Sequence, residues 1–414
     1  MPKCGFEREC TFRFELRYYF LGCYCLLRLG IGDSVQICTK CLLPETHETI
    51  SFDENGVCSV CKNFSIKQEV DWEQRHQVLL SLVDKIKTRK ALYDCVIPFS
   101  GGKDSTFSLY YAVETLKLKV LVVSFDHGFY RENLLRNRER TINKLGVDLL
   151  TFRPSQKLVK KLMLQSLRDK GDFCWHCHTG IGSYPLQVAV EKSIPLVLWG
   201  ESSTEYTNYF KVEDFHTIDE VVFNRSTNLG ISASDMYFRL NEEFELREFA
   251  PFTVPSLSEL QSKDITTFPL GNFIKWNTKK QVEIIKDKLG WQGDEVEGVP
   301  NQYDYEKIEC MMQGMRDYIK YVKRGYARTS HLASIDIRNG SIGRDEAQAL
   351  VEKYEGQKPE SIKLFLDFLQ ITEDELNEII RDQSIDPWEG KIPVKIGKAP
   401  HDYSNWQKKL LNLK

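Results

Sequence analysis

Apolar and polar positions follow two different periods along the middle of the chain. Short apolar runs such as 120–125 have the length of buried strands, and longer segments between them repeat apolar residues every three or four positions, as amphipathic helices do. This alternation predicts an α/β fold with a parallel sheet that binds its ligand at the carboxyl ends of the strands. The expected order is strand 92–99, helix 104–116, strand 120–125, helix 132–145, strand 148–152, helices 156–170 and 181–192, and strand 195–200.

Beyond residue 235 the apolar pattern becomes mainly helical. A basic and aromatic face over 317–328 is either solvated surface or a receptor for an anionic substrate, such as a sugar linked to a nucleotide diphosphate. The expected helices are 279–289, 305–324, 344–354, 359–368 and 373–381. We therefore expect four regions, which are an extension over 1–33, a zinc-binding knuckle over 34–70, an α/β domain over 71–235 and a mainly helical region over 236–414.

The first strand of the α/β region runs into a glycine turn and then directly into a helix. The turn reads Ser100-Gly-Gly-Lys-Asp-Ser-Thr106. Gly101 and Gly102 can adopt positive φ and let phosphate oxygens approach the main chain, while the amides that open the helix donate to anions. Further donors come from Ser100, Lys103, Ser105 and Thr106. The segment predicts a phosphate-binding loop, and the alternative is a serine-glycine turn that only caps a helix.

The spacing of this loop excludes two commoner nucleotide motifs. No glycine stands five residues before Gly102, as a Walker loop requires, and no complete G-x-G-x-x-G follows a predicted strand. The loop instead resembles the S-G-G-x-D-S-[ST] loop of the PP-loop ATP pyrophosphatases. The resemblance implies that ATP is cleaved between its α and β phosphates, that the loop holds pyrophosphate, and that AMP passes to an oxygen of the substrate. It also implies catalytic roles for Lys103 and for Asp104, the latter through Mg²⁺.

Two later strand ends are expected to line the nucleotide site. Ser124-Phe-Asp-His-Gly128 closes the second strand, where a PP-loop protein seats adenosine by backbone contacts, although Asp126 and His127 would also suit loop capping. Gly200 and Glu201 close a later strand, and Glu201 is either a further Mg²⁺ ligand or a loop cap. The expected ATP-binding residues are Ser100, Gly101, Gly102, Lys103, Asp104, Ser105, Thr106, Ser124, Phe125, Asp126, Gly200 and Glu201.

Three of the cysteine pairs have C-x-x-C spacing, among twelve cysteines in 414 residues. Two such pairs about 15 to 20 residues apart are typical of a zinc site. Four thiolates close a tetrahedral site and leave no position for water, so this zinc is expected to be structural. His47 lies between the pairs, is redundant as a ligand, and is expected on the surface. The expected zinc ligands are Cys38, Cys41, Cys58 and Cys61.

The third pair, Cys174 and Cys177, encloses His176. These residues are candidates for an acceptor pocket, for a second metal or an iron-sulfur cluster, or for packed thiols beside a buried tryptophan. Their distance from the loop is similar to that of the cysteine pair in PP-loop tRNA thiolases, so a tRNA thiolase that uses Cys174 and Cys177 is the main alternative function. The net charge of -3 argues against a nucleic acid partner, whose binding usually leaves a basic footprint.

The knuckle, the loop and the helical tail together resemble an N-acetyl sugar amidotransferase of bacterial surface-polysaccharide biosynthesis, which supplies lipopolysaccharide (LPS) and O-antigen. The resemblance covers about residues 36–385. It implies that an acetamido group of a nucleotide-activated sugar becomes an acetamidino group through an adenylated amide. In relatives the second cysteine of the third pair is often missing, which argues against an iron-sulfur cluster. The matching stretches are 37–46, 52–61, 93–106, 173–176, 195–201, 325–328, 333–338 and 344–347.

The ammonia for this reaction needs a source. Met1 is followed by Pro2 rather than cysteine, and no G-x-C-x-G elbow appears, so the chain should have no glutaminase activity. The resemblance implies a separate glutaminase subunit and an ammonia-channelling protein. The alternative of a nucleotide-binding scaffold without turnover is opposed by the intact loop.

We expect a cytoplasmic protein, because no apolar run reaches the about twenty residues of a membrane span. The first 33 residues show no clear signal peptide. They are expected to be an extension that starts at an upstream codon, or else a membrane-surface or partner-binding segment.

Overall fold

The computed structural model describes residues 35–200, 220–397, 400, 401 and 403. The extension over 1–33 and Glu201 lie outside these residues. Every described helix and strand belongs to the unit that begins at Ile37.

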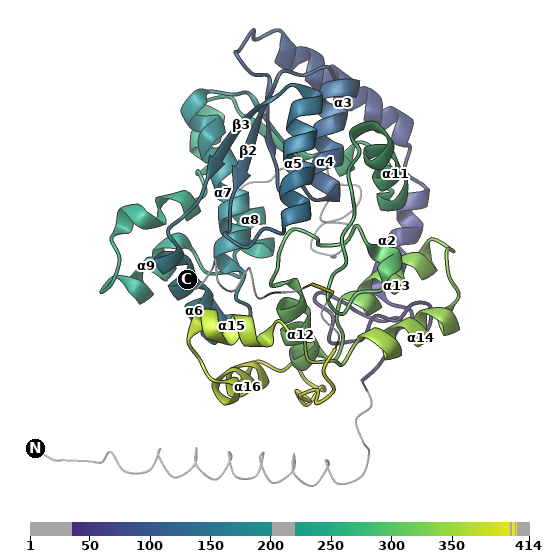
Figure 1. The fold of residues 1–414 in the computed structure, drawn as a ribbon. Coiled ribbons are helices and arrows are strands. Elements are labelled where there is room, and N and C mark those ends of the chain that lie inside the picture. Colours follow the sequence, from purple (N-terminus) through teal and green to yellow (C-terminus); the bar gives the residue numbers. More distant parts are fainter. Residues whose placement is uncertain (1–34, 201–219, 398–399, 402, 404–414) are drawn as a thin grey trace, which may run out of the picture. The chain divides into compact units, whose positions relative to one another are not determined.

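A parallel sheet of five strands, in the order β3-β2-β1-β4-β5, organises the α/β part (Figure 1). The predicted α/β class is therefore confirmed. β1 lies in the middle, with Cys95 beside Val120 of β2 and Val96 beside Val197 of β4. β5 lies past residue 235, in the region expected to be mainly helical. The strands are β1 (Cys95–Pro98), β2 (Val120–Phe125), β3 (Asp148–Phe152), β4 (Leu196–Trp199) and β5 (Thr266–Pro269).

Helices cover both faces of this sheet. Alternate strand residues point to opposite faces, so each face packs against its own set of helices. Cys95 and Ile97 pack with α3, α4, α5 and α11, whereas Val96 packs with α7 and α10. Figure 1 shows α3, α4 and α5 side by side on the first face. The helices of this part are α3 (Trp72–Lys87), α4 (Lys103–Tyr110), the π-helical turn η1 (Tyr111–Thr115), α5 (Glu132–Leu145), α6 (Gln156–Lys170), α7 (Trp175–Lys192), α8 (Glu220–Ser226), α9 (Ala233–Leu240), the 3-10 turn η3 (Leu246–Phe252), α10 (Leu257–Ser262), the 3-10 turn η4 (Leu270–Asn272) and α11 (Thr278–Leu289).

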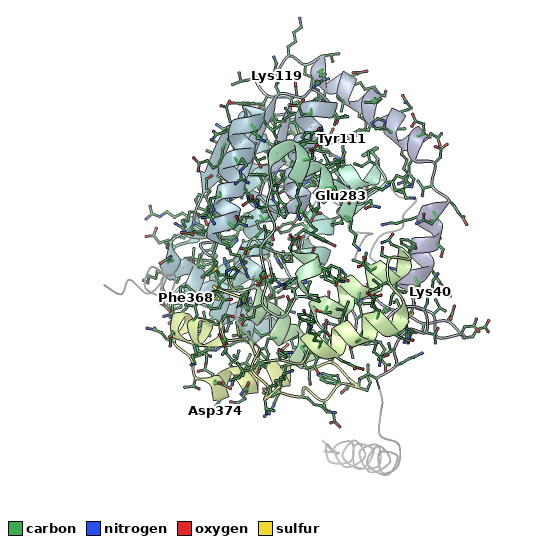
Figure 2. The ribbon with its side chains drawn as sticks, turned by 45° about the vertical axis from the view of Figure 1, so that its right-hand side comes forward. Lys40, Tyr111, Lys119, Glu283, Phe368 and Asp374 are labelled. Carbon is green, nitrogen blue, oxygen red and sulfur yellow. The ribbon has the colours of Figure 1, made fainter. Side chains whose placement is uncertain are left out.

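The C-terminal helices build a second core. In α15 the buried Phe368, labelled in Figure 2, contacts the ring of Phe129 with centroids 5.3 Å apart. None of the helices in the described ranges has both the length and the apolar character that crossing a membrane requires. The remaining elements are α2 (Ser59–Gln68), the 3-10 turn η5 (Asn301–Tyr303), α12 (Gln313–Arg324), α13 (Arg328–Arg338), α14 (Arg344–Tyr354), α15 (Ile362–Leu369) and α16 (Glu373–Asp382).

The predicted helix over 305–324 forms only in its second half. Residues before Gln313 are held by the segment that follows β2, where Met311 N donates to Phe129 O at 2.9 Å and Arg131 Nε donates to Cys310 O at 3.2 Å. These tertiary hydrogen bonds replace the helical ones. Helix α13 was not predicted, because its buried face carries polar residues such as Ser334 that resemble a solvated surface.

Gly180 of α7 offers a test of the packing against the sheet. A Cβ at this position would lie 2.2 Å from Cζ of Phe125, whose ring is buried in the core and has no free space. We expect Gly180→Ala to lower the free energy of unfolding by about 1–3 kcal/mol through overpacking, measured by urea denaturation. Gly343→Ala, where no atom lies within 4 Å, is the control for steric crowding, and its cost should be limited to the less than about 1 kcal/mol that alanine adds at the N-cap of α14. A gain of about 1 kcal/mol for Gly180→Ala, as helix propensity alone would give, would contradict this packing.

Candidate functional site

The glycine loop lies between β1 and α4, where the sequence placed it. Gly101 has φ of 91°, which favours glycine. The side chains of two serines close the loop, because Ser105 Oγ accepts from Gly101 N at 3.1 Å and Ser100 Oγ accepts from Gly102 N at 3.2 Å. The two Oγ atoms are 3.1 Å apart. These amides therefore already point at oxygen acceptors, and phosphate oxygens are stronger acceptors than hydroxyls.

Lys103 lies in a buried cluster of charges. Its Nζ is 2.7 Å from Asp104 Oδ2 and 2.9 Å from Glu306 Oε2. Glu306 Oε1 lies 3.4 Å from Arg328, which lies 3.4 Å from Asp317 of α12. A chain of alternating charges thus joins the loop to the C-terminal helices. Burial alone would raise the pKa of Glu306, but Lys103 and Arg328 outweigh it and lower the pKa to about 2, so Glu306 is ionised at neutral pH.

Residues that sequence analysis missed cover the loop from the C-terminal side. Trp291 Nε1 donates to Gly101 O at 3.0 Å. A Cβ on Gly102 would lie 1.7 Å from Glu309 Oε1, so the side chain of Glu309 fills the space that this glycine leaves. No local sequence motif contains Trp291, Glu306 or Glu309. Only the folded structure brings these residues to the loop.

Asp104 has the free acceptor that a Mg²⁺ ligand needs. Its Oδ2 receives Lys103, whereas its Oδ1 is buried and has no hydrogen-bond partner among the described residues. A carboxylate oxygen beside a phosphate loop suits Mg²⁺, so the residues present fit this ion. Gly200 lies beside Asp104, since a Cβ on Gly200 would lie 3.6 Å from Cβ of Asp104.

At the end of β2, the polar side chain of Asp126 already has partners within the protein. Asp126 Oδ1 accepts from Gly128 N at 2.8 Å, and Asp126 Oδ2 lies 3.2 Å from Arg153. Ser124 and Phe125 are both buried, and Phe125 O already accepts from the Tyr130 hydroxyl at 2.9 Å. The capping role of Asp126 is thus present, and adenosine binding at this strand end stays a prediction.

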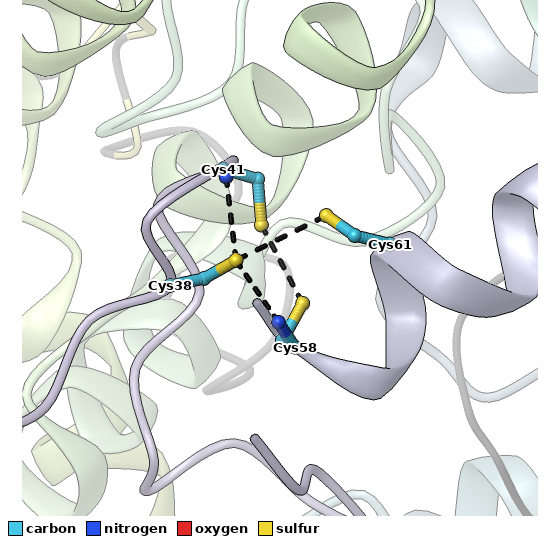
Figure 3. Close-up of side chains that lie close together, drawn as sticks. All are labelled: Cys38, Cys41, Cys58 and Cys61. Carbon is cyan, nitrogen blue, oxygen red and sulfur yellow. Dashed lines mark hydrogen bonds between the residues drawn. The ribbon is translucent and has the colours of Figure 1, made fainter. Parts of the chain in front are cut away.

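The four cysteines of the predicted zinc site converge (Figure 3). Their sulfur atoms all lie within 4.8 Å of one another, with 4.0 Å between Cys38 and Cys61 and 3.8 Å between Cys41 and Cys58. A tetrahedral ion with Zn–S bonds of about 2.3 Å requires sulfurs about 3.8 Å apart. The amides of Cys41 and Cys58 also donate to Cys38 Sγ at 3.4 and 3.2 Å, as expected around a thiolate ligand. The cluster therefore fits structural zinc.

The expectation that His47 lies on the surface is wrong. Its side chain is buried, and its ring stacks on those of Tyr326 and His331 at centroid distances of 5.6 and 6.4 Å. The knuckle packs on the C-terminal helices, where Leu42 N donates to Ser334 Oγ at 3.1 Å. Burial, followed by the charge of Lys320, lowers the pKa of His47 to about 4, so the ring is neutral at physiological pH.

The third cysteine pair lies at the start of α7, and the structure places a third thiol in the same core. Cys174 precedes the helix and packs in the core that Cys310 borders. The backbone of Cys310 forms an antiparallel β-bridge with that of Tyr130. The ring of the preceding residue, Phe129, lies 6.2 Å from that of the buried His176, measured between centroids. Burial raises the pKa of Cys310 to about 11 and lowers that of His176 to about 4, so both are neutral at pH 7. Among the described residues, only the four cysteines of the knuckle bring their ligand atoms close enough to hold a metal ion, so this arrangement favours packed thiols.

Two cations of the basic face expected over 317–328 have partners within the protein. Lys323 Nζ donates to Lys170 O at 2.6 Å and to Gly171 O at 3.2 Å, and Arg324 lies 2.9 Å from Glu48. These cations therefore join the C-terminal helices to the knuckle and to α6. Sequence alone could not show this, because each partner is distant along the chain.

Lys320 of this face makes the stability of the protein depend on pH. Burial, followed by the charge of Arg328, lowers its pKa from 10.5 to about 7. Between about pH 7 and pH 10 the folded state therefore binds fewer protons than the unfolded state, so stability should rise with pH. We expect Lys320→Met to weaken this rise, measured as unfolding free energy at pH 7 and pH 9. Lys280→Met, at an exposed site, should follow the wild type, and an unchanged slope in Lys320→Met would contradict the prediction.

A cavity of about 590 Å³ adjoins the chain of charges. Asp317 forms part of its wall, and aromatic, acidic and basic side chains surround it. Among them are Glu297, Tyr318, Tyr321, Tyr354, Glu355, Lys353 and Lys358. Most of the lining comes from residues 297–400.

Comparisons with known proteins give matches to parts of the chain. In sequence, 114 residues are 25% identical to an uncharacterized protein of Methanocaldococcus jannaschii, over 27% of this chain and 41% of that protein. In a second match, 91 residues are 25% identical to the glutamine-hydrolyzing GMP synthase of Pyrobaculum aerophilum, over 22% of this chain and 18% of that protein. The chain thus spans about two fifths and about one fifth of these relatives.

Among solved structures, the U34-tRNA thiolase NcsA from Methanococcus maripaludis, with its [4Fe-4S] cluster, matches with a TM-score of 0.31 and 15% identity, over 78% of this chain and 90% of that one. Residues 297–412 match the family model described as LPS biosynthesis protein WbpG-like, C-terminal domain. This C-terminal region is therefore similar to the WbpG-like LPS biosynthesis proteins, which supports the relationship to surface-polysaccharide biosynthesis that the sequence predicted.

Proposed function

We propose that the protein is an ATP-dependent amidotransferase, which converts the acetamido group of a nucleotide-activated sugar into an acetamidino group. The observation that carries the proposal is the ion pair of 2.9 Å between Lys103 of the glycine loop and Glu306 of the WbpG-like region. It joins a loop suited to triphosphate chemistry to a domain of the LPS biosynthesis family. The similarity to that family supports the choice of substrate, and the loop supports the choice of reaction.

The chemistry must turn a poor electrophile into a reactive one. The amide oxygen attacks the α phosphorus of ATP, the bond to the β phosphate breaks, and an imidate that carries AMP forms. Ammonia then adds to the imidate carbon, AMP departs with the oxygen, and a proton is released. Lys103 and the loop amides stabilise the charge that builds on pyrophosphate. Asp104 would hold Mg²⁺, which would supply further positive charge there.

The proposal includes partners and a location. A separate glutaminase subunit supplies ammonia, and a channelling protein delivers it. Zinc on the four cysteines has a structural role only. We place the reaction in the cytoplasm, where ATP and nucleotide-activated sugars are available.

The direct test is incubation with ATP, Mg²⁺, ammonium and a panel of nucleotide-activated acetamido sugars, followed by mass spectrometry. Exchange of oxygen for NH should make one sugar about one mass unit lighter. AMP and pyrophosphate should appear in equal amounts with it. Release of ADP, or AMP formation without any modified sugar, would contradict the proposal.

One observation favours the alternative of a tRNA thiolase, namely that Cys310 joins the core that contains Cys174. That alternative requires these thiols to hold a metal or a cluster. Protein purified without oxygen should contain no stoichiometric iron or sulfide and should modify no tRNA. Bound iron and sulfide together with thiolated tRNA would establish the alternative instead.

A further inference from the structure

A buried guanidinium lies directly against the glycine loop. Arg138 of α5 is 7% exposed, and its Cγ would lie 2.2 Å from a Cβ on Gly101. Its guanidinium carbon is 4.6 Å from the centre of the Tyr130 ring and 5.8 Å from that of Phe99. The stem of Arg138 thus rests on the loop glycine, and its charge lies between the segments that follow β1 and β2.

Among the described residues this cation has no carboxylate partner, unlike its buried neighbours. Lys103 pairs with Asp104 and Glu306, and Arg131 lies 3.9 Å from Asp294. Within the part of the chain that the structure describes, Arg138 forms no ion pair, and its Nη1 is buried without a hydrogen-bond partner. Burying an unpaired charge is unfavourable, and the aromatic rings offset only part of the penalty. An anionic ligand would neutralise it.

The surroundings define the chemical class of that anion. Arg138 lies beside Gly101, at the N-terminus of α4, where amides and the helix dipole favour phosphate. A planar guanidinium fork can bind two phosphate oxygens at once. The nearby His127 does not compete, because burial, followed by the charges of His176 and Arg138, keeps its pKa well below the usual value. Glu309 fills the space over Gly102 and forms no ion pair with Arg138 in the described structure.

We propose that Arg138 binds the terminal phosphates of the nucleoside triphosphate, and that it completes a pyrophosphate site with the loop and Lys103. The assignment rests on the proposed function for its ligand, ATP, but not for the sugar. It gives the leaving pyrophosphate a second cation. AMP lacks these phosphates and should not depend on Arg138.

The test is calorimetric titration of pyrophosphate, of AMP and of α,β-methylene ATP, which the enzyme cannot cleave, into the full-length protein. Arg138→Met should weaken binding of pyrophosphate and of the ATP analogue by about 10- to 100-fold, the loss expected for hydrogen bonds to a charged group, and AMP binding by less than about twofold. Arg136→Met is the matched control, because Arg136 is on the same helix but exposed and pairs with Glu132 at 3.4 Å. It should bind all three ligands like the wild type.

Each outcome decides the assignment. The assignment is overturned if Arg138→Met binds pyrophosphate as tightly as the wild type does. It is also overturned if AMP and pyrophosphate lose affinity equally, because a merely structural arginine would act on all ligands alike. If Arg138→Met does not fold, Arg138→Gln provides the same comparison. If the wild type forms no amidine yet Arg138→Met selectively loses pyrophosphate, the proposed function fails while the Arg138 site stands.

Discussion

Replacing Lys103 with alanine is expected to slow the formation of AMP and pyrophosphate by about 10²- to 10³-fold, the usual effect of removing one preorganised charge from a transition state. Lys103 is buried, so its charge acts at short range and is not screened by water. Asp104 and Glu306 hold its Nζ at 2.7 and 2.9 Å, which fixes the ammonium beside the loop. The measurement is the steady-state rate of AMP and pyrophosphate release with the best sugar from the panel.

The control for this prediction is Lys117→Ala. Lys117 lies just beyond the helix that Lys103 begins, is exposed, and pairs with Glu114 at 3.0 Å, so its loss should leave the rate unchanged. Lys103→Ala should still fold, because Glu306 keeps Arg328 at 3.4 Å. A wild-type rate in folded Lys103→Ala would remove the loop from the proposed mechanism.

Lys103→Ala should also change the response to acid. The lowered pKa of Glu306, about 2 in the folded protein, contributes stability that is present above its unfolded pKa and is lost as the pH falls towards 2. Lys103 is the largest influence that lowers this pKa, so the contribution should shrink in the variant. The difference in unfolding free energy between wild type and variant should therefore become smaller as the pH falls from about 4.5 to 2. Urea denaturation at each pH measures it.

Features that depend on neighbouring residues could be predicted from the sequence. The strands at 120–125 and 148–152 and the helices at 132–145 and 156–170 have the predicted bounds, because their apolar periods are set locally. The glycine loop and the four-cysteine cluster follow from spacing in the same way.

The rest of the site could not be read from the sequence. Glu306 and Arg138 reach the loop only through tertiary packing, and neither belongs to a motif. The partners of the basic face over 317–328 were missed for a related reason. Its cations bind backbone carbonyls and carboxylates of distant segments, and a sequence pattern carries no information about such partners.

Replacing Cys41 with serine is expected to abolish zinc binding and to unfold the knuckle. Structural zinc contributes folding energy directly, with apparent values of about 10–16 kcal/mol in zinc-finger peptides. Arg344 Nη1 donates to Cys38 O at 2.8 Å and also to Cys41 O, so loss of the knuckle should loosen α14. We expect the midpoint of thermal unfolding to fall by at least about 5 °C. Elemental analysis should find one zinc per chain in the wild type and none in the variant.

Cys177→Ser is the matched control, because it removes a thiol outside the cluster and should keep the zinc. Four thiolates leave no open coordination position, so the metal should affect stability rather than catalysis. Cys41→Ser, assayed at a temperature where the α/β part remains folded although the knuckle does not, should therefore retain the turnover of the wild type. Iron in place of zinc would make the metal assignment wrong. A folded Cys41→Ser with normal nucleotide binding but no turnover would mean that the knuckle contributes to the chemistry, against the structural role argued from its closed geometry.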